Sequence, residues 1–166
     1  MATVTAQFRT PADEDVALAL VENRAPSVGH LYRDRVAKTP KAPAFMYAVV
    51  GPGGDDWRTD TWEATKARTD AYAGGLLALG IEPEERVAIA SGTRLEWAHA
   101  DLAVMSAGAA TTTIYPTTIA DDVAFILSDS GSRIVFAENA AQVDKLRSIR
   151  EQTPAVKAVV VIDPAG

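Results

Sequence analysis

Short apolar runs alternate with helix-compatible segments along the second half of the chain, and this alternation constrains the fold more than any other feature. Runs such as Val-Ala-Ile-Ala and Ile-Val-Phe-Ala are typical of strands covered on both faces. The predicted strands span residues 86–90, 110–115, 133–136 and 157–162, and the predicted helices span 94–108, 119–129 and 140–150. Such an order predicts an α/β fold: a mostly parallel sheet with helices on both faces.

The first part of the chain predicts an arm, a helix and a hairpin. Residues 1–26 are polar and interrupted by prolines, so we expect an arm whose order depends on a surface to pack against. Ser27 can cap a helix that runs to about Lys38. The predicted organisation is therefore an arm over 1–26 and an α/β subdomain over 27–166. Two strands around a glycine-rich turn, 44–50 and 57–60, predict an N-terminal hairpin.

A long amphipathic helix follows the hairpin. Its apolar face is formed by positions 62, 65, 69, 72, 76 and 79, and Gly80 has the position of a glycine that ends a helix. Gly74 and Gly75 lie inside it, where each glycine costs about 1 kcal/mol relative to alanine. We expect close packing of this helix on the sheet to offset that cost.

The composition excludes several classes of protein. A formal net charge of -6 argues against a nucleic-acid surface, which needs clustered Lys and Arg. The chain has no cysteine and only two histidines, far apart, so neither disulfides nor a zinc centre are expected. No apolar stretch approaches the ~20 residues that span a bilayer, and no secretory leader is evident. We expect a cytoplasmic protein, with peripheral membrane contact left open. The chain stops after a strand, where an α/β chain usually continues, so a longer polypeptide is expected.

The stretch Ser91-Gly92-Thr93 follows a predicted strand and raises the question of a phosphate-binding loop. Such a loop needs several inward-pointing N–H groups and usually a lysine, whereas this stretch has one glycine and no lysine. Thr93 and Glu96 have the spacing of a capping box instead, which favours a structural helix start.

The helix that starts there predicts a buried stripe and a histidine at its edge. The stripe consists of Leu95, Ala98, Leu102, Met105 and Ala109. His99 adjoins the stripe, and we interpret it as a boundary residue with a hydrogen-bonded partner rather than a catalytic base, because the sequence places no nucleophile or carboxylate pair beside it.

Tyr115, Pro116 and Thr117 end a predicted parallel strand, since proline cannot donate to a ladder. Ligands of open α/β sheets usually bind at this end of the strands. Two interpretations stay open: a binding loop, or a plain strand end in which Thr118 caps the next helix opposite Asp121.

With these elements in place, the stretch GIEPEERVAIASGTRLEWAHADLAVMSAGAATTTIYPTTIADDVAFILSDSGSRIVFAEN resembles the adenylate-forming acyl-CoA synthetases of the AMP-binding family. The resemblance is closest to bacterial long-chain fatty-acid ligases and covers about residues 27–163. It rests on Trp62-Glu63, Leu79-Gly80, the passage Gly-Ala-Ala-Thr-Thr-Thr-Ile-Tyr-Pro, and Ser-Asp-Ser-Gly-Ser-Arg-Ile-Val-Phe. It implies that the chain is part of the large N-terminal domain of such an enzyme.

The resemblance also implies an activity for the full-length protein. These ligases convert a carboxylate and Mg-ATP to an acyl-adenylate and pass the acyl group to coenzyme A. ATP, Mg²⁺ and coenzyme A are thus the expected cofactors of the whole enzyme, and none is expected to bind the fragment. The family's phosphate loop reads roughly Ser/Thr-Gly-Thr-Thr-Gly-x-Pro-Lys-Gly, and Ser91-Gly92-Thr93 shares only its first three letters. We therefore expect no catalytic residue and no metal ligand in this chain, and an inactive fragment.

Five residues are candidates for the channel through which coenzyme A reaches the acyl-adenylate. The resemblance implies that the loop with Tyr115, Pro116 and Thr117 lies near this channel, although some members carry glycines there. Lys145 and Arg147 on the next helix are candidates for the nucleotide phosphates of coenzyme A, against the alternative of solvated charges on a polar helix face.

The expected partners are the remainder of the same polypeptide and a fatty acid, with no nucleic acid and no membrane span. A fragment should expose apolar surface, so a homo-oligomer is expected. The alternative is a self-contained α/β binding or interaction module without catalysis.

Overall fold

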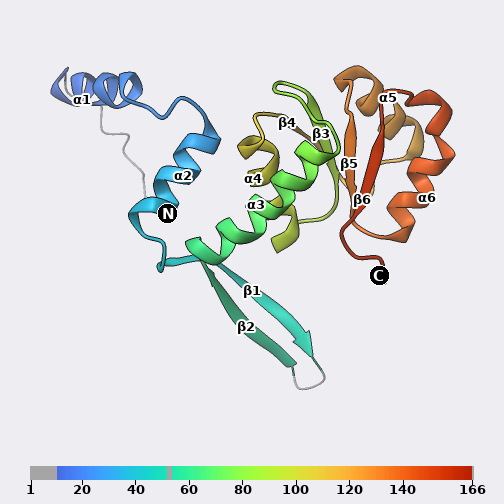
Figure 1. Cartoon of the computed structure of the whole chain (residues 1–166), viewed down its shortest axis with the longest axis horizontal. Coiled ribbons are helices and arrows are strands. Elements are labelled where there is room, and N and C mark those ends of the chain that lie inside the picture. Colours follow the sequence, from blue (N-terminus) through green and yellow to red (C-terminus); the bar gives the residue numbers. More distant parts are fainter. Residues whose placement is uncertain (1–10, 52–53, 166) are drawn as a thin grey trace, which may run out of the picture.

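Four parallel strands form the centre of the fold, as predicted (Figure 1). The computed structural model describes residues 11–51 and 54–165. The strands are β3 (Arg86–Ala90), β4 (Ala110–Ile114), β5 (Ile134–Ala137) and β6 (Ala158–Val161), in the spatial order β4-β3-β5-β6. Every neighbouring pair in this sheet is parallel.

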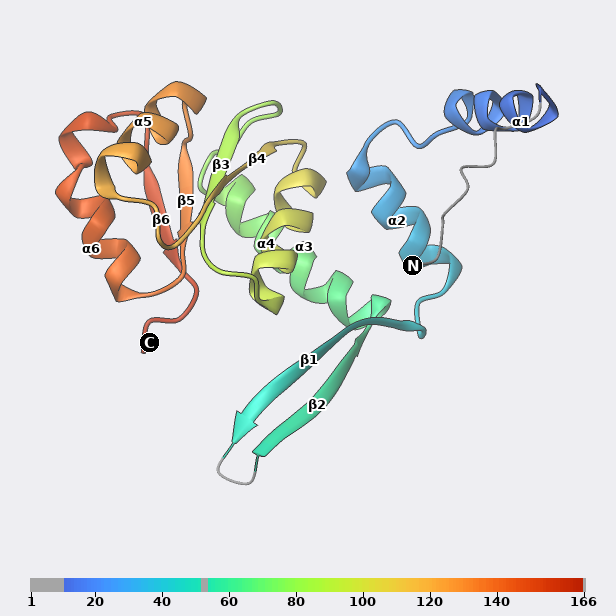
Figure 2. The same ribbon diagram turned by 180° about the vertical axis from the view of Figure 1, so that it is seen from behind.

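Helices cover both faces of the sheet. Helices α3 (Trp62–Ala78) and α4 (Leu95–Ser106) lie on one side, and α5 (Ala120–Ser130) and α6 (Ala140–Ser148) on the other (Figure 2). A 3₁₀ turn, η1 (Arg150–Gln152), follows α6. Alternate residues of β3 divide between the two layers: Val87 and Ile89 pack with α3 and α4, whereas Ala88 and Ala90 pack with α5 and α6. The sheet thus has the two-sided core that its apolar strands predict.

The predicted hairpin consists of β1 (Pro43–Gly51) and β2 (Gly54–Thr61), which pair antiparallel and project away from the sheet (Figure 1). Helix α2 (Val28–Lys38) precedes it. The hydroxyl of Ser27 accepts the His30 N–H, so the predicted cap is confirmed.

Part of the predicted arm is a helix, α1 (Pro11–Glu22), that extends away from the other elements, and residues 1–10 lie outside the described residues (Figure 1). The division into an arm over 1–26 and a subdomain over 27–166 stays a prediction.

Helix α3 ends as its sequence predicts, but its glycines do not pack as expected. Gly80 has a φ of +80°, and the N–H of Ile81 returns to the carbonyl of Leu76. A Cβ at Gly74 or Gly75 would meet nothing within 4 Å. The expected packing of α3 on the sheet is confirmed and runs through Ala73 and Leu76. Gly74 and Gly75 take no part in it, because both lie on the exposed side of the helix, and no contact in the structure explains them.

Helix α4 is buried along a different stripe from the predicted one. Its buried residues are His99, Ala100, Ala103 and Val104, whereas the predicted positions Leu95, Ala98, Leu102, Met105 and Ala109 are only partly buried. Small side chains fit where α4 lies close to the sheet and to α3, so the alanines, not the larger residues, face the core.

Candidate functional site

The carboxyl ends of the four parallel strands meet at one edge of the sheet, where ligands of open α/β sheets usually bind. Strand β4, the next strand in the chain after β3, pairs with one edge of β3, and β5 pairs with the opposite edge. The ends of β3 and β5 therefore border the position at which the strand order reverses, the favoured place for a ligand. Residues 91–94 and 138–139 follow these two strands.

The backbone N–H of Gly92, in the turn that follows β3, is bonded to a carboxylate and is not available to a phosphate. The amide of Gly92 donates to Oε2 of Glu138 at 2.9 Å, and the Ser91 hydroxyl donates to the Gly92 carbonyl at 3.0 Å. A phosphate site at a strand-to-helix turn uses several free N–H groups. Because Glu138 takes this one, the turn agrees with the prediction of a structural helix start rather than a nucleotide cradle.

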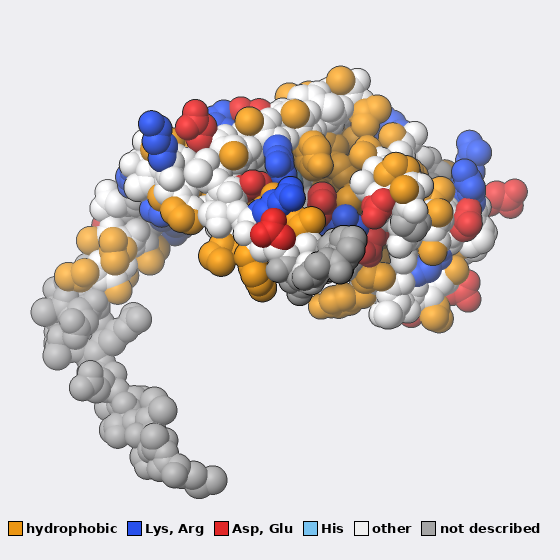
Figure 3. Space-filling view, turned by 90° about the horizontal axis from the view of Figure 1, so that it is seen from below, with side chains coloured by type: hydrophobic (Ala, Val, Ile, Leu, Met, Phe, Trp, Pro, Cys, Tyr) orange, Lys and Arg blue, Asp and Glu red, His pale blue; other side chains and the backbone are white. Residues whose placement is uncertain are grey.

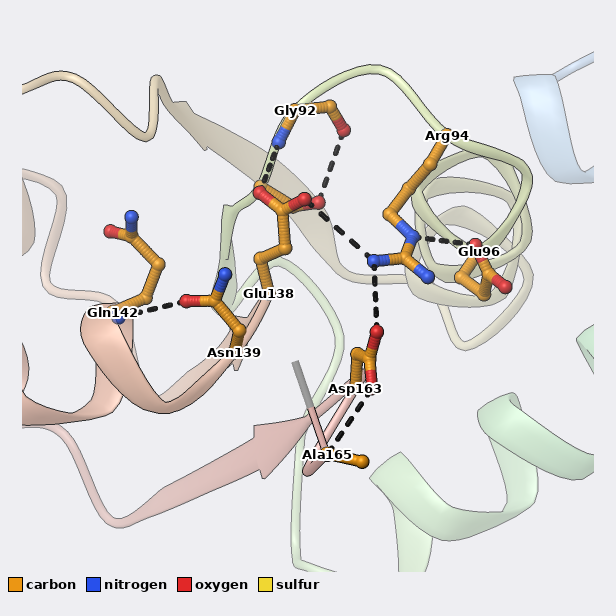
Figure 4. A network of polar contacts seen from close by, with 9 residues as sticks. Gly92, Arg94, Glu96, Glu138, Asn139, Gln142, Asp163 and Ala165 are labelled. Carbon is orange, nitrogen blue, oxygen red and sulfur yellow. Dashed lines mark hydrogen bonds and ion pairs between the residues drawn. The ribbon is translucent and has the colours of Figure 1, made fainter. Parts of the chain in front are cut away.

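Arg94 links three carboxylates at this edge (Figure 4). Its Nε donates to Oε2 of Glu96 at 2.7 Å, and a terminal guanidinium nitrogen lies 3.7 Å from Oε1 of Glu138 and 4.0 Å from Oδ2 of Asp163. The hydrogen bond from Arg94 lowers the pKa of Glu96. One cation among three anions leaves this edge net negative, which disfavours a polyphosphate.

The predicted cap of α4 and the alternative in which Thr118 caps α5 are both wrong. Arg94 is the N-cap of α4 without a side-chain cap bond, and Glu96 bonds Arg94 instead of completing a capping box with Thr93. A charge-assisted hydrogen bond is about twice as strong as a neutral one. The Glu96 carboxylate therefore bonds the Arg94 guanidinium rather than the backbone N–H of Thr93. In α5 the N-cap is Ile119, also without a side-chain cap bond, rather than Thr118.

Lys145 contacts the loop after β4 directly. Its ammonium group donates to the carbonyls of Pro116 at 2.8 Å and Thr118 at 2.7 Å. The buried side chain of Gln142, one turn earlier on α6, donates to the same Pro116 carbonyl at 3.2 Å. Helix α6 thus clamps this loop through two side chains on one face.

The structure brings four of the five candidate residues together. Tyr115 and Thr117 are exposed at the end of β4, and Lys145 holds the loop that contains them and Pro116. Arg147 is separate: its guanidinium pairs with Asp144 at 3.0 Å, and 76 % of its side chain is exposed. Lys145 is therefore engaged with the protein itself, whereas Arg147 lies on the solvated face of α6.

His99 is buried rather than at a boundary, and the predicted hydrogen-bonded partner is absent for one ring nitrogen. Only 1 % of the residue is exposed, and its Nε2 has no partner among the described residues. The rings of Phe45 and Tyr72 approach it edge-on, with centroids 6.1 and 6.4 Å away. Burial, with a smaller contribution from Arg68, lowers the pKa of His99. The residue is thus a neutral core histidine.

Sequence reasoning missed the residues that link the strand ends. Glu138 and Asp163 each come at or just after the end of an apolar strand, and this position was a usable signal. Gln142 gave no signal, because a polar residue in an amphipathic helix usually faces water.

Two absences hold for the described part of the chain. Residues 11–51 and 54–165 contain no group of three or more His, Asp or Glu side chains arranged to hold a metal ion. None of the helices in those ranges is long and apolar enough to cross a membrane.

A comparison with protein families identifies the family to which this chain belongs. Residues 32–166 match the family described as AMP-binding enzyme. The chain belongs to that family. The match begins within α2 and continues through β6, so it includes the hairpin, the parallel sheet and the clamped loop. The predicted resemblance to AMP-binding enzymes is confirmed.

Several curated relatives of this chain are long-chain-fatty-acid–CoA ligases. The protein heimdall of Drosophila melanogaster is 30% identical over 134 residues, which are 81% of this chain and 20% of the relative. FadD15 of Mycobacterium tuberculosis is 34% identical over 110 residues, which are 66% of this chain and 18% of the relative. The chain thus spans about a fifth of the length of the curated relatives that it matches.

Solved structures give the same relationship. A fatty acyl CoA synthetase of Mycobacterium tuberculosis superposes with a TM-score of 0.69 and 28% identity over 82% of this chain and 26% of its own. The N-terminal domain of FACL13 from the same organism gives a TM-score of 0.69 and 28% identity over 84% of this chain and 34% of its own. The predicted fold, part of the N-terminal domain of an acyl-CoA synthetase, is confirmed.

Proposed function

We propose that this chain is the N-terminal portion of an ATP-dependent long-chain fatty acid–CoA ligase. The whole enzyme would convert a fatty acid and ATP to an acyl-adenylate and then form the thioester with coenzyme A. The observation that carries the proposal is the identity of 30% and 34% to two long-chain-fatty-acid–CoA ligases, of which the chain spans about a fifth.

The chain's own contribution is one wall of the active-site cleft, without nucleotide binding. The residues at the strand ends do not fit ATP or Mg²⁺: Glu138 takes the Gly92 N–H, and Arg94 is paired with carboxylates. We therefore assign ATP and Mg²⁺ to other parts of the longer polypeptide, which is also the chain's expected partner. A cytoplasmic location and a role in lipid metabolism belong to the same proposal.

The loop of Tyr115, Pro116 and Thr117 borders the coenzyme A channel in this proposal. Lys145 acts by holding the loop, because it bonds the backbone carbonyl of Pro116 within the loop and that of Thr118 directly after it. Of Lys145 and Arg147, only Arg147 is exposed enough to bind an anion, and a phosphate would have to displace Asp144 from it.

Isothermal titration calorimetry of residues 1–166 with Mg-ATP tests the absence of nucleotide binding. We expect no heat of binding from the chain, whereas the fatty acyl CoA synthetase of Mycobacterium tuberculosis serves as the positive control. Formation of palmitoyl-adenylate by residues 1–166, detected by mass spectrometry, would contradict the proposal.

A self-contained binding module is the second candidate. One observation favours it: an uncharacterized Mycobacterium tuberculosis protein, Rv1549, is 28% identical over 101 residues, and these residues make up 56% of that relative. Sequencing the gene beyond codon 166 distinguishes the candidates. A glycine-rich segment with a lysine supports the ligase, and a stop codon supports the module.

A further inference from the structure

Strand β6 forms an unpaired edge of the parallel sheet. It is the last strand in the order β4-β3-β5-β6, so among the described residues only β5 pairs with it (Figure 1). The Lys157 N–H, just before β6, donates to the Arg133 carbonyl at 2.7 Å. Because successive N–H groups of a strand point to opposite sides, those of Ala158 and Val160 point to the free edge. This edge can therefore accept another strand.

The residues of β6 are those of an inner strand rather than an edge strand. Its sequence is Ala-Val-Val-Val, whereas β4, at the opposite edge of the sheet, has the sequence Ala-Thr-Thr-Thr-Ile. Val159 and Val161 are 40% and 37% exposed, and in the view of Figure 3 hydrophobic side chains reach the surface of the body between charged ones. Strands that are covered on both faces are apolar throughout, and free edges usually carry charges or proline. The composition of β6 thus indicates that a further segment covers it.

An apolar hollow borders β6 on each face of the sheet. The α6-side hollow, of about 440 Å³, is lined by apolar side chains that include Val143, Leu146, Val156, Val159 and Val161. The α3-side hollow, of about 250 Å³, has an apolar lining that includes Tyr72, Leu76, Leu79, Val160 and Ile162. The side chains of a strand point alternately to the two faces of a sheet. One strand added beside β6 would therefore place side chains in both hollows.

Gly75 leaves room in the α3-side hollow. It lines this hollow on the exposed side of α3, and an added Cβ would meet nothing within 4 Å. A glycine inside a helix costs about 1 kcal/mol relative to alanine. Space for an incoming side chain gives this glycine a role that no contact within the described residues gives it.

Three cations line the α6-side hollow and indicate the charge of its occupant. Arg147 pairs with Asp144, whereas Arg150 and Lys157 form no ion pair among the described residues. Two copies that paired their β6 edges across a two-fold axis would bring these cations together on one face, where like charges repel. A segment that carries a carboxylate fits this hollow better than a second copy does.

The remainder of the polypeptide supplies such a segment. This chain spans about a fifth of two long-chain-fatty-acid–CoA ligases, so in the proposed function most of the enzyme lies outside residues 1–166. We propose that a strand from the polypeptide that follows residue 166 pairs with the free edge of β6. Its apolar side chains fill the two hollows alternately, and it brings a carboxylate to Arg150 and Lys157. This inference rests on the proposed function, which supplies the longer polypeptide.

Photocrosslinking of the full-length protein identifies the segment beside β6. Val159 is replaced by p-benzoylphenylalanine, which bonds covalently to neighbouring segments on illumination, and the linked peptides are mapped by mass spectrometry. We expect peptides from beyond residue 166 of the same chain. Phe125 is the matched control, because it is 69% exposed on α5 and lines neither hollow, so the same replacement there should give a lower yield of such links. Links from position 159 that are confined to residues 1–166, or equal yields at the two positions, overturn the proposal.

Amide hydrogen exchange gives a second measurement. In residues 1–166 the Val160 N–H faces a free edge, and in the full-length protein it should bond the added strand. Its exchange should therefore slow by more than about tenfold, since exchange then requires local opening. Strand β3 is central in both cases and measures the general gain in stability. An equal change at β3 and at Val160 overturns the proposal.

Failure of this inference can be distinguished from failure of the proposed function. A stop codon directly after codon 166 overturns both, because no later segment then exists. If the full-length protein forms palmitoyl-CoA but position 159 links only to residues 1–166, the proposed function stands and the pairing with β6 is overturned.

Discussion

The backbone of α2 passes α4 at Gly29, where an added Cβ would lie 2.8 Å from the carbonyl oxygen of Met105. Gly29 is buried in the first turn of α2 and its φ is not positive, so its role is close approach and not an unusual backbone angle. The absence of a side chain at Gly29 lets the backbones of α2 and α4 pack closely. An alanine at position 29 would thus obstruct the observed packing of α2 against α4.

Gly29→Ala should lower the free energy of unfolding by about 1–3 kcal/mol, because the new methyl group must displace a backbone carbonyl. Gly74→Ala is the matched control, since a Cβ there would meet nothing within 4 Å. The control should stabilise the protein by up to about 1 kcal/mol through helix propensity. Urea unfolding measures both, and equal effects at the two positions would refute the close approach.

Glu138→Ala should destabilise the protein by about 1–3 kcal/mol, because it leaves the Gly92 N–H without its acceptor and removes one partner of Arg94. Glu138→Gln keeps an acceptor and should have a smaller effect. The exposed Glu151→Ala serves as the control in the same urea measurement. If the alanine and glutamine variants unfold alike, the bond to Gly92 contributes nothing.

The stability of the protein should fall as the pH is lowered from 7.5 to 5.5. Burial lowers the pKa of His99 below its ordinary value of 6.5, so the folded state holds the ring neutral. The unfolded state binds a proton as the pH passes below that ordinary value, and the equilibrium shifts toward unfolding. The stabilisation is therefore present above pH 6.5 and is lost in acid.

His99→Gln isolates this contribution, because glutamine does not titrate. The urea midpoint of the variant should depend less on pH over this range than that of the unmodified chain. His30→Gln, at an exposed histidine, should retain the full pH dependence. An unchanged slope in His99→Gln would show that other groups cause the acid sensitivity.

The strands of the sheet could be predicted to within about a residue or two, since each apolar run is bounded by turn residues or proline. The buried face of α4 could not be predicted from its apolar periodicity. The periodicity of Leu95, Leu102 and Met105 suggested a stripe, but the core lies along Ala100 and Ala103. Periodicity counts large apolar residues, whereas close packing of a helix on a sheet selects small ones.

The candidate site was predictable in position but not in its contacts. The end of β4 was evident from Pro116, and Lys145 was identified as a site residue. Its partner could not be identified, because a lysine that bonds backbone carbonyls 27 to 29 residues away leaves no local pattern. The ion pair between Arg94 and Glu138 requires β3 and β5 to be neighbours in the sheet. The spacing of the elements along the sequence does not predict which strands are neighbours.

Lys145→Met should loosen the loop after β4 while leaving the rest of the fold in place. The variant keeps the length of the side chain but removes both hydrogen bonds to the Pro116 and Thr118 carbonyls. We expect faster amide hydrogen exchange in the segment from Thr117 to Ile119, since local opening no longer breaks those bonds. Arg147→Met is the matched control on the same helix, because Arg147 pairs only with the exposed Asp144 among the described residues. Equal exchange in both variants would mean that Gln142 alone holds the loop, and Lys145 would lose its assigned role.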